Sequence, residues 1–144
     1  MPTPKRDTAR TMSQENVELI RTLFERFDRD GFLSEELWHS DAVLVNFRES
    51  PIPGPYRGHE GLRKWRDELF EVLNEGRFDV ESLTDAGEAN AVVAKVRLRG
   101  RARHTDIEVN VPFSITAWIQ EGRIARSESY TDHAEALEAA GLSE

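Results

Sequence analysis

Hydrophobic residues in the first part of the chain recur at the three- and four-residue spacing of an amphipathic helix. They form one stripe, consisting of Val17, Ile20, Leu23, Phe24 and Phe27. This spacing predicts a helix that begins at Ser13, which can cap it, and that ends at the segment DRDG. We expect the stripe to face the protein core.

A short helix, a strand and a longer helix are predicted next. The short helix holds Leu37 and Trp38, and the strand covers 42–47. The following segment, ESPIPGPYRG, has three prolines, which exclude a regular helix or a paired central strand. We interpret it as an ordered loop that folds over another part of the protein. The longer helix covers about 60–73 and has its own apolar stripe, which includes Trp65.

The second half of the chain alternates between hydrophobic and polar residues with the period of two that β-strands show. Four strands are predicted, over 78–84, 92–101, 106–119 and 123–131. Asp132 then caps a short last helix that ends at Gly141. Helices followed by a run of strands indicate an α+β fold. We expect one domain over 13–144, preceded by a disordered or loosely held leader over 1–12.

Charged residues suggest a register for the hairpin made by the second and third of these strands. Pairing Arg99 with Asp106, and Arg97 with Glu108, places opposite charges on one face and apolar residues on the other. We therefore interpret the row of arginines in the segment RLRGRAR (97–103) as a solvated strand face whose charges are paired, with phosphate binding as the alternative. His104, Asp106 and Glu108 could ligate a metal only if the carboxylates were free of arginine, so we expect no metal site.

The last hairpin turns at Glu121 and Gly122, and a register set by this turn divides its residues between two faces. One face is small and hydroxylic apart from a tryptophan, and consists of Ser114, Thr116, Trp118, Ala125, Ser127 and Ser129. The other face is large and mostly apolar, and consists of Phe113, Ile115, Ala117, Ile119, Ile124, Arg126, Glu128 and Tyr130. Neither face is expected to be exposed to water.

The composition, with 144 residues, 38% hydrophobic and 32% charged, is typical of a globular protein with a single core. The net charge of −8 argues against binding to nucleic acid or to an anionic membrane. The absence of cysteine excludes disulfides and thiolate ligands. No apolar run has the length of a membrane span, and the first residues lack the apolar centre of a secretion signal. We therefore expect a cytoplasmic location.

Three segments carry a family resemblance: SQENVELIRTLFERFDRDG near the start, YRGHEGLRKW in the middle and SYTDHAEALEAAGL near the end. They are similar to the SnoaL-like polyketide cyclase branch of the nuclear transport factor 2-like superfamily. The resemblance covers about 13–142. It implies a cone-shaped, curved antiparallel sheet wrapped around the N-terminal helices, with a ligand-sized cavity. This scaffold hosts isomerases, cyclases, dehydratases, hydrolases and non-enzymatic binders, so the resemblance implies no single reaction.

Ketosteroid isomerase, a relative by fold, uses a general base and an oxyanion hole with two hydrogen-bond donors. The resemblance places its base at Asn46, an amide that cannot act as a base, and its protonated acid at Ser114, a weaker donor. Its tyrosine donor falls near Leu23. The carboxylate of polyketide cyclases falls near Ser129, whereas Glu128 is expected on the opposite face. The chain therefore departs from the known catalytic patterns at each of these positions.

The same alignment places the hydroxylic face of the last hairpin inside the cone. The candidate ligand-binding residues are then Trp38, Asn46, Trp65, Ser114, Thr116, Trp118, Ser127 and Ser129. Asn46 could orient a ligand carbonyl or could satisfy a neighbouring backbone group. Tryptophans at helical positions, as expected for Trp38 and Trp65, are more often plain core residues than ligand contacts.

Three functions remain open. The first is a protein that binds a small hydrophobic molecule, polyketide-like or steroid-like, among neutral polar groups and without a cofactor. The second is an enzyme of isomerase, cyclase or dehydratase type, in which His59 acts as the base with Tyr56 beside it. His59 could instead bond only to the loop backbone. The third is a subunit that pairs with another protein through its sheet, which would leave no open cavity.

The choice of inner face also predicts how the protein assembles. With the hydroxylic face inside, the large side chains lie outside, namely Phe113, Ile115, Ile119, Ile124 and Tyr130. An uncovered apolar patch of this kind is near the upper limit for a soluble monomer. We therefore expect a homodimer that buries the patch between two sheets.

Overall fold

A computed structural model gives the backbone of residues 4–31 and 33–142, and the side chains from residue 13 onward within these ranges. Its helices are α1 (Pro4–Asp30), α2 (Gly58–Val72) and α3 (His133–Ala139), with short 3₁₀ helices η1 (Glu35–Leu37) and η2 (Gly87–Ala89). Its strands are β1 (Trp38–Val45), β2 (Tyr56–Arg57), β3 (Leu73–Ala86), β4 (Ala91–Ala102), β5 (Glu108–Gln120) and β6 (Arg123–Tyr130). In this described part of the chain, no helix is both long and apolar enough to cross a membrane.

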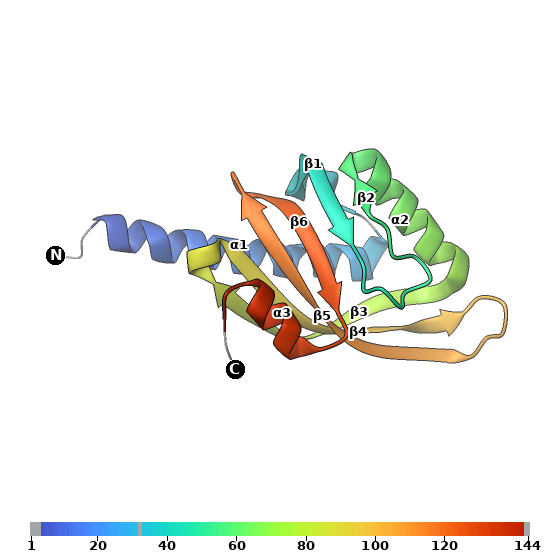
Figure 1. Ribbon diagram of the computed structural model, residues 1–144. Coiled ribbons are helices and arrows are strands. Elements are labelled where there is room, and N and C mark those ends of the chain that lie inside the picture. Colours follow the sequence, from blue (N-terminus) through green and yellow to red (C-terminus); the bar gives the residue numbers. More distant parts are fainter. Residues whose placement is uncertain (1–3, 32, 143–144) are drawn as a thin grey trace.

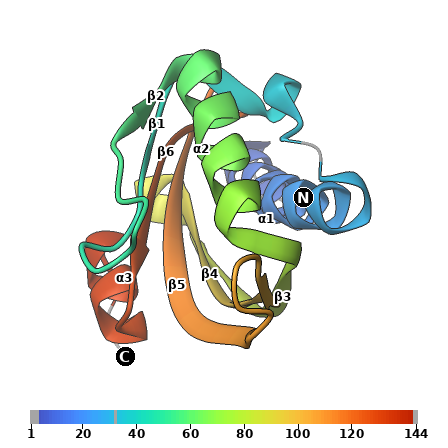
Figure 2. The same ribbon diagram turned by 90° about the vertical axis from the view of Figure 1, so that its right-hand side faces the viewer.

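The strands form one sheet in the order β2-β1-β6-β5-β4-β3, and every neighbouring pair is antiparallel except β1 and β6. The sheet curves strongly, α1 and α2 lie on its concave side, and α3 lies on the other side (Figures 1 and 2). The predicted α+β cone is therefore confirmed. The curvature creates a space between the concave face and the two long helices, and the hydrophobic stripes of both helices point into it.

The first helix begins earlier than its sequence pattern predicts. It starts at Pro4, so Ser13 lies inside the helix and does not cap it. Of the predicted leader, residues 1–3 lie outside the described residues, and the backbone of 4–12 continues α1 beyond the body of the protein (Figure 1). The helix ends as predicted, because Gly31 adopts a positive φ of 69° and its N–H donates to the carbonyl of Phe27 at 2.7 Å.

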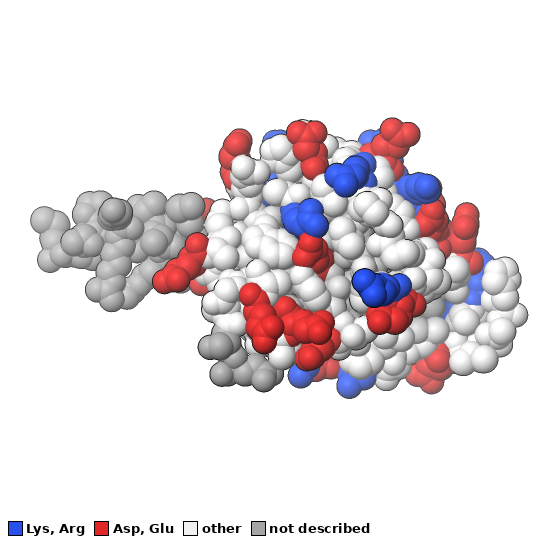
Figure 3. Space-filling view, viewed as in Figure 1, with Lys and Arg blue, Asp and Glu red and all other residues white. Residues whose placement is uncertain are grey.

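The register of the β4–β5 hairpin differs from the prediction, but its two faces do not. Arg99 pairs with Asn110 rather than Asp106, which is a shift by an even number of residues. An even shift leaves every side chain on its expected face. The arginines find their acids mainly on β3: Arg97 contacts Glu81 at 2.6 Å and Arg99 contacts Asp79 at 3.2 Å. On the face seen in Figure 3, acidic and basic side chains are likewise interspersed.

The β5–β6 hairpin contains a β-bulge that changes the assignment of faces. Near the turn, Ile119 pairs with Ile124 as predicted. One residue further from the turn on β5, Trp118 pairs with Arg126 of β6, so Ala125 is the extra residue of the bulge. The rest of β6 is therefore displaced by one residue, so Ser129 pairs with Ile115. A one-residue displacement turns each side chain to the opposite face. Ser127 and Ser129 consequently share the concave face with the large apolar residues of β5.

The predicted inner positions of β5 are wrong, because Ser114, Thr116 and Trp118 lie on the convex face under α3. Thr116 is fully buried, and its hydroxyl donates to the carbonyl of Ala136 at 2.7 Å. The hydroxyl of Ser114 is 2.7 Å from Nδ1 of His133 at the start of α3. Trp118 packs beside a second small core between the sheet and α3, formed by Ala86, Ala91, Val93, Ala136, Leu137 and Ala140.

The predicted dimer interface is wrong for the same reason. Phe113, Ile115 and Ile124 face the concave side, where they line the interior, and Ile119 belongs to the same core. Tyr130 does lie on the convex side, but it packs against the core under α3. The short last helix therefore covers the part of the convex face that the prediction left bare. These residues are not available to a second subunit.

Replacing Thr116 with valine tests this assignment of faces. The change keeps the shape of the side chain but leaves the carbonyl of Ala136 without its donor, so we expect the free energy of unfolding to fall by about 1–2 kcal/mol. Urea denaturation measures it. The matched control is Thr131→Val at an exposed position, which should change stability by less than about 0.5 kcal/mol. An unchanged stability for Thr116→Val would contradict the docking of α3 through this hydroxyl.

Candidate functional site

A cavity of about 360 Å³ lies between the concave face of the sheet, α1, α2 and the loop that joins β1 to β2. Its deep end is closed by Trp38 and Ile124, which are 4% and 0% exposed. At its other end Val72 at the end of α2 is 40% exposed, and Val109 and Val111 on β5 are partly exposed. The mouth therefore lies at the end of the molecule that faces the viewer in Figure 2.

The lining of this cavity is hydrophobic except for four neutral polar residues. These are Asn46, Ser50, Ser127 and Ser129, which we call the polar wall. Much of the remaining lining is aromatic, and the rings contact one another: Phe78 lies 5.3 Å from Phe27 and 6.2 Å from Phe113 between ring centres. Aromatic side chains packed in this way hold their positions with little freedom. The cavity is therefore framed by fixed rings on one side and by small polar groups on the other.

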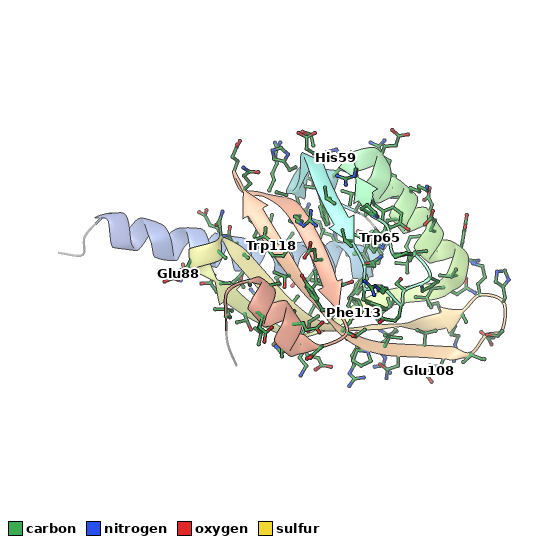
Figure 4. The ribbon with its side chains drawn as sticks, in the orientation of Figure 1. His59, Trp65, Glu88, Glu108, Phe113 and Trp118 are labelled. Atoms are coloured by element: carbon green, nitrogen blue, oxygen red, sulfur yellow. The ribbon has the colours of Figure 1, made fainter. Side chains whose placement is uncertain are left out.

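The structure brings together five of the eight predicted ligand-binding residues. The cavity lining includes Trp38, Asn46, Trp65, Ser127 and Ser129. The other three, Ser114, Thr116 and Trp118, lie on the opposite face of the sheet and do not reach the cavity. Figure 4 labels His59 and Trp65 on α2, and Phe113 and Trp118 at separate points along β5.

Several lining residues were missed by the sequence reasoning, and they have two origins. Phe113, Ile115 and Ala117 of β5 were placed on the wrong face, because the family resemblance put Ser114 inside the cone and side chains alternate along a strand. The loop residues Phe47 and Ile52 were not named. Their signal was the proline-rich composition, which correctly predicted an ordered loop folded over another part of the protein.

Hydrogen bonds of the polar wall hold this loop in place. The side-chain amide of Asn46 donates to the carbonyl of Ile52 at 2.7 Å. The hydroxyl of Ser129 accepts from the backbone N–H of Phe47 at 2.9 Å and donates to Oδ1 of Asn46 at 3.4 Å. Asn46 therefore satisfies a neighbouring backbone group, which was one of the two roles considered for it; the other was to orient a ligand carbonyl. It also lines the cavity, so the two interpretations are compatible.

The candidate catalytic residues His59 and Tyr56 lie outside the cavity lining. Nε2 of His59 is 3.0 Å from the carbonyl of Trp38, and its Nδ1 is 3.4 Å from Oε1 of Glu35. Tyr56 is buried, and its hydroxyl donates to Glu68 at 2.5 Å. Both side chains thus fasten α2 and β2 to their neighbours, and neither is positioned to exchange a proton with a molecule in the cavity.

Among the residues that the structure describes, the lining contains no aspartate, glutamate, histidine, lysine, arginine or tyrosine. Of the positions that correspond to ketosteroid isomerase, Asn46 and Leu23 do line the cavity, whereas Ser114 does not. The residues on either side of Ser114 that face inward are Phe113 and Ile115, which have no polar atom in the side chain. The cavity therefore offers hydrogen bonds and hydrophobic contact, but no group that titrates. In the described residues, no three His, Asp or Glu side chains meet as a metal site requires.

Fold and cavity together define a small α+β cone protein with an internal ligand-sized space. A family profile described as SnoaL-like domain matches residues 17–127, and the chain therefore belongs to the SnoaL-like family. The expected family resemblance is confirmed. A comparison with curated proteins found no match.

Solved structures of similar fold cover most of the chain. A protein of Burkholderia thailandensis, described as NTF2-like, is 21% identical with a TM-score of 0.72, and the match covers 88% of this chain and 97% of that one. A protein of Catenulispora acidiphila with a ketosteroid isomerase-like fold, in complex with trimethylamine, is 16% identical with a TM-score of 0.67, covering 85% and 92%. TerC, co-crystallised with polyporic acid, is 19% identical with a TM-score of 0.70, covering 88% and 98%.

The two tyrosines of the chain provide a test of these side-chain environments. Burial, together with hydrogen bonds to Glu68 and Glu128, raises the pKa of Tyr56 and of Tyr130 well above the ordinary value of 10.0. Because the folded state holds these protons more tightly, their contribution to stability is complete below pH 10 and is lost as the pH rises further. We expect no tyrosinate absorbance from the native protein at pH 10, and its appearance together with unfolding at higher pH.

An ultraviolet titration measures this directly. In concentrated guanidinium chloride both tyrosines should ionise near their ordinary pKa, which provides the control. The variant Tyr130→Phe leaves Tyr56 as the only source of signal. A tyrosine that ionises near pH 10 while the protein remains folded would show that its contact with the carboxylate is absent.

Proposed function

We propose that this protein binds a small, mostly hydrophobic molecule in the cavity and does not carry out acid–base chemistry on it. The observation that supports this most is the lining itself, which in the described part of the chain is hydrophobic with four neutral polar residues and no titratable group. Ligand pockets typically have this composition, with a few polar groups that fix orientation. The ligands named for two solved relatives, trimethylamine and polyporic acid, are consistent with small-molecule binding by this fold.

The size of the cavity limits the ligand. A volume of about 360 Å³ is near the lower end of the range for small-molecule pockets. At the packing density of protein interiors, such a space holds a molecule of about 270 Å³. A two- or three-ring polyketide-like compound meets this limit with little strain, and a steroid skeleton is at its upper edge.

Catalysis by His59 and Tyr56 receives no support from their positions. General acid–base catalysis needs the group within hydrogen-bond reach of the reacting atom, directly or through one water. Both residues are bound to other parts of the fold and neither lines the cavity. A subunit that only pairs through its sheet is disfavoured as well, since that function predicted no open cavity.

A cavity-filling substitution tests the binding function. Ala117 lines the cavity from β5, and replacing it with leucine would occupy part of the space. We expect the affinity for naphthalene, used as a neutral probe, to fall by about tenfold, because the ligand loses buried contacts worth about 0.8 kcal/mol per methylene. Binding is followed by the fluorescence of Trp38 and Trp65, which line the cavity, and by calorimetry. The control is Ala139→Leu, the same change at an exposed position on α3.

Two results would count against the proposal. One is a wild-type protein that binds no naphthalene at its solubility limit. The other is an Ala117→Leu variant with unchanged affinity, which would place the probe elsewhere on the protein.

Absence of isomerase chemistry is a separate expectation. Cyclohex-3-enone, a small unsaturated ketone, should isomerise no faster with the protein than in buffer, because the cavity contains no base to remove the proton and no acid to hold the enolate. The absorbance of the conjugated product measures the rate. Turnover that disappears on replacing Asn46 with leucine would show that the cavity is catalytic after all.

A further inference from the structure

The polar wall occupies one side of the cavity. Ser127 and Ser129 come from β6, and Asn46 and Ser50 come from the loop after β1. These two segments adjoin, since the backbone of Phe47 is bonded to Ser129. The lining contributed by α1, α2, β3, β4 and β5 is entirely hydrophobic. A molecule in the cavity therefore meets most of the hydrogen-bonding groups on one side, and on the others a hydrophobic surface that includes the indole ring of Trp65.

Most of the polar wall is already engaged within the protein. Asn46 donates to the carbonyl of Ile52, and Ser129 both accepts from Phe47 and donates to Asn46. The hydroxyl of Ser50 accepts from the N–H of Ile52 at 3.1 Å. These three residues shape the loop, so their first role is to build the cavity.

Ser127 differs from the other three. It lies on β6 between Leu44 of β1 and Ala117 of β5, and it is 8% exposed. None of the residues that the structure describes forms a hydrogen bond with its hydroxyl. Because every fully enclosed polar side-chain atom in the described part has a partner, this hydroxyl must border open space, which here is the cavity. A serine hydroxyl can both donate and accept, so it is ready for a polar group of the ligand.

We propose that Ser127 determines ligand specificity by bonding to an uncharged oxygen, a carbonyl or a hydroxyl, on an otherwise hydrophobic molecule. This inference rests on the proposed binding function. The ligand carries its oxygen against β6, and its hydrocarbon body lies against the rings of Phe113 and Phe78 and the helices. A site that hydrogen-bonds one ligand group discriminates against analogues that lack it, because its own polar group is then left unpaired.

The lining also excludes charged ligands. A carboxylate or an ammonium group in this cavity would lose its water without gaining an opposite charge, which is strongly unfavourable. The two charged neighbours of Ser127 on β6, Arg126 and Glu128, point to the convex face and contact each other there at 2.5 Å. The aromatic rings could attract a cation, but no carboxylate lines the cavity to assist them.

The test uses two probes of the same shape and two matched serine variants. The probes are 2-acetylnaphthalene, which carries a carbonyl, and 2-isopropenylnaphthalene, in which a methylene replaces the oxygen. The variants are Ser127→Ala and Ser114→Ala, which remove a buried hydroxyl from the two faces of the same sheet. Dissociation constants are measured for each pair by calorimetry and tryptophan fluorescence. The charged analogues 2-naphthoate and 2-naphthyltrimethylammonium complete the set.

We expect Ser127→Ala to weaken binding of the ketone by about fivefold, because the hydrogen bond to its carbonyl is lost, and not to weaken binding of the alkene, which has no oxygen to accept that bond. Ser114→Ala should change neither affinity. Both charged analogues should bind at least about tenfold more weakly than the ketone.

The remaining outcomes separate this inference from the function on which it rests. If both naphthalene probes bind but Ser127→Ala affects them equally or not at all, Ser127 is not the determinant, and the binding function stands. If either charged analogue binds more tightly than the ketone, the preference for an uncharged ligand is wrong. If neither neutral probe binds the wild-type protein, the binding function fails and the inference fails with it.

Discussion

The alternation of side chains along β5 governs both sides of the sheet. Phe113, Ile115 and Ala117 point into the cavity, whereas Ser114 and Thr116 between them point to α3. A strand in the middle of a sheet cannot change one face without changing the other, since its side chains have a period of two. The position of the cavity, the docking of the last helix and the identity of the lining residues all depend on this one register.

Buried hydroxyl groups have two different uses on this sheet. On the convex face, Thr116 donates to the carbonyl of Ala136, and Ser114 contacts His133, so both add hydrogen bonds to the small apolar core that docks the last helix. On the concave face, Ser129 bonds to Phe47 and holds the loop over the cavity. Small hydroxylic residues in a strand pattern thus indicate burial with a partner, but the partner can be a helix, a loop or a ligand.

The walls of the cavity are held by contacts among the lining residues and with the rest of the fold. The loop is held by its own hydrogen bonds to Asn46 and Ser129, and the rings of Phe24, Phe27 and Phe78 pack against each other. Leu62, fully buried on α2, and Tyr56, bonded to Glu68, fix that helix to the sheet. The interior therefore does not need to collapse for the fold to be stable, and the space remains available for a ligand.

The amino-acid sequence by itself determined most of the helices and strands and the α+β class, because these depend on local periodicity and on turn residues that can be read directly. The family was indicated by the resemblance of three sequence segments. The sequence also named Trp38, Asn46 and Trp65 as cavity residues, although Trp38 begins β1 rather than lying in the predicted short helix, and Asn46 follows the end of β1. The tertiary structure alone decided which face of the last hairpin is inside. One extra residue, Ala125, displaces β6 by one position, and whether a strand accommodates such a bulge depends on its pairing with β1 and β5 rather than on its own pattern. Likewise, only three-dimensional packing removed His59 and Tyr56 from the cavity, since their partners Trp38 and Glu68 are brought to them by the fold.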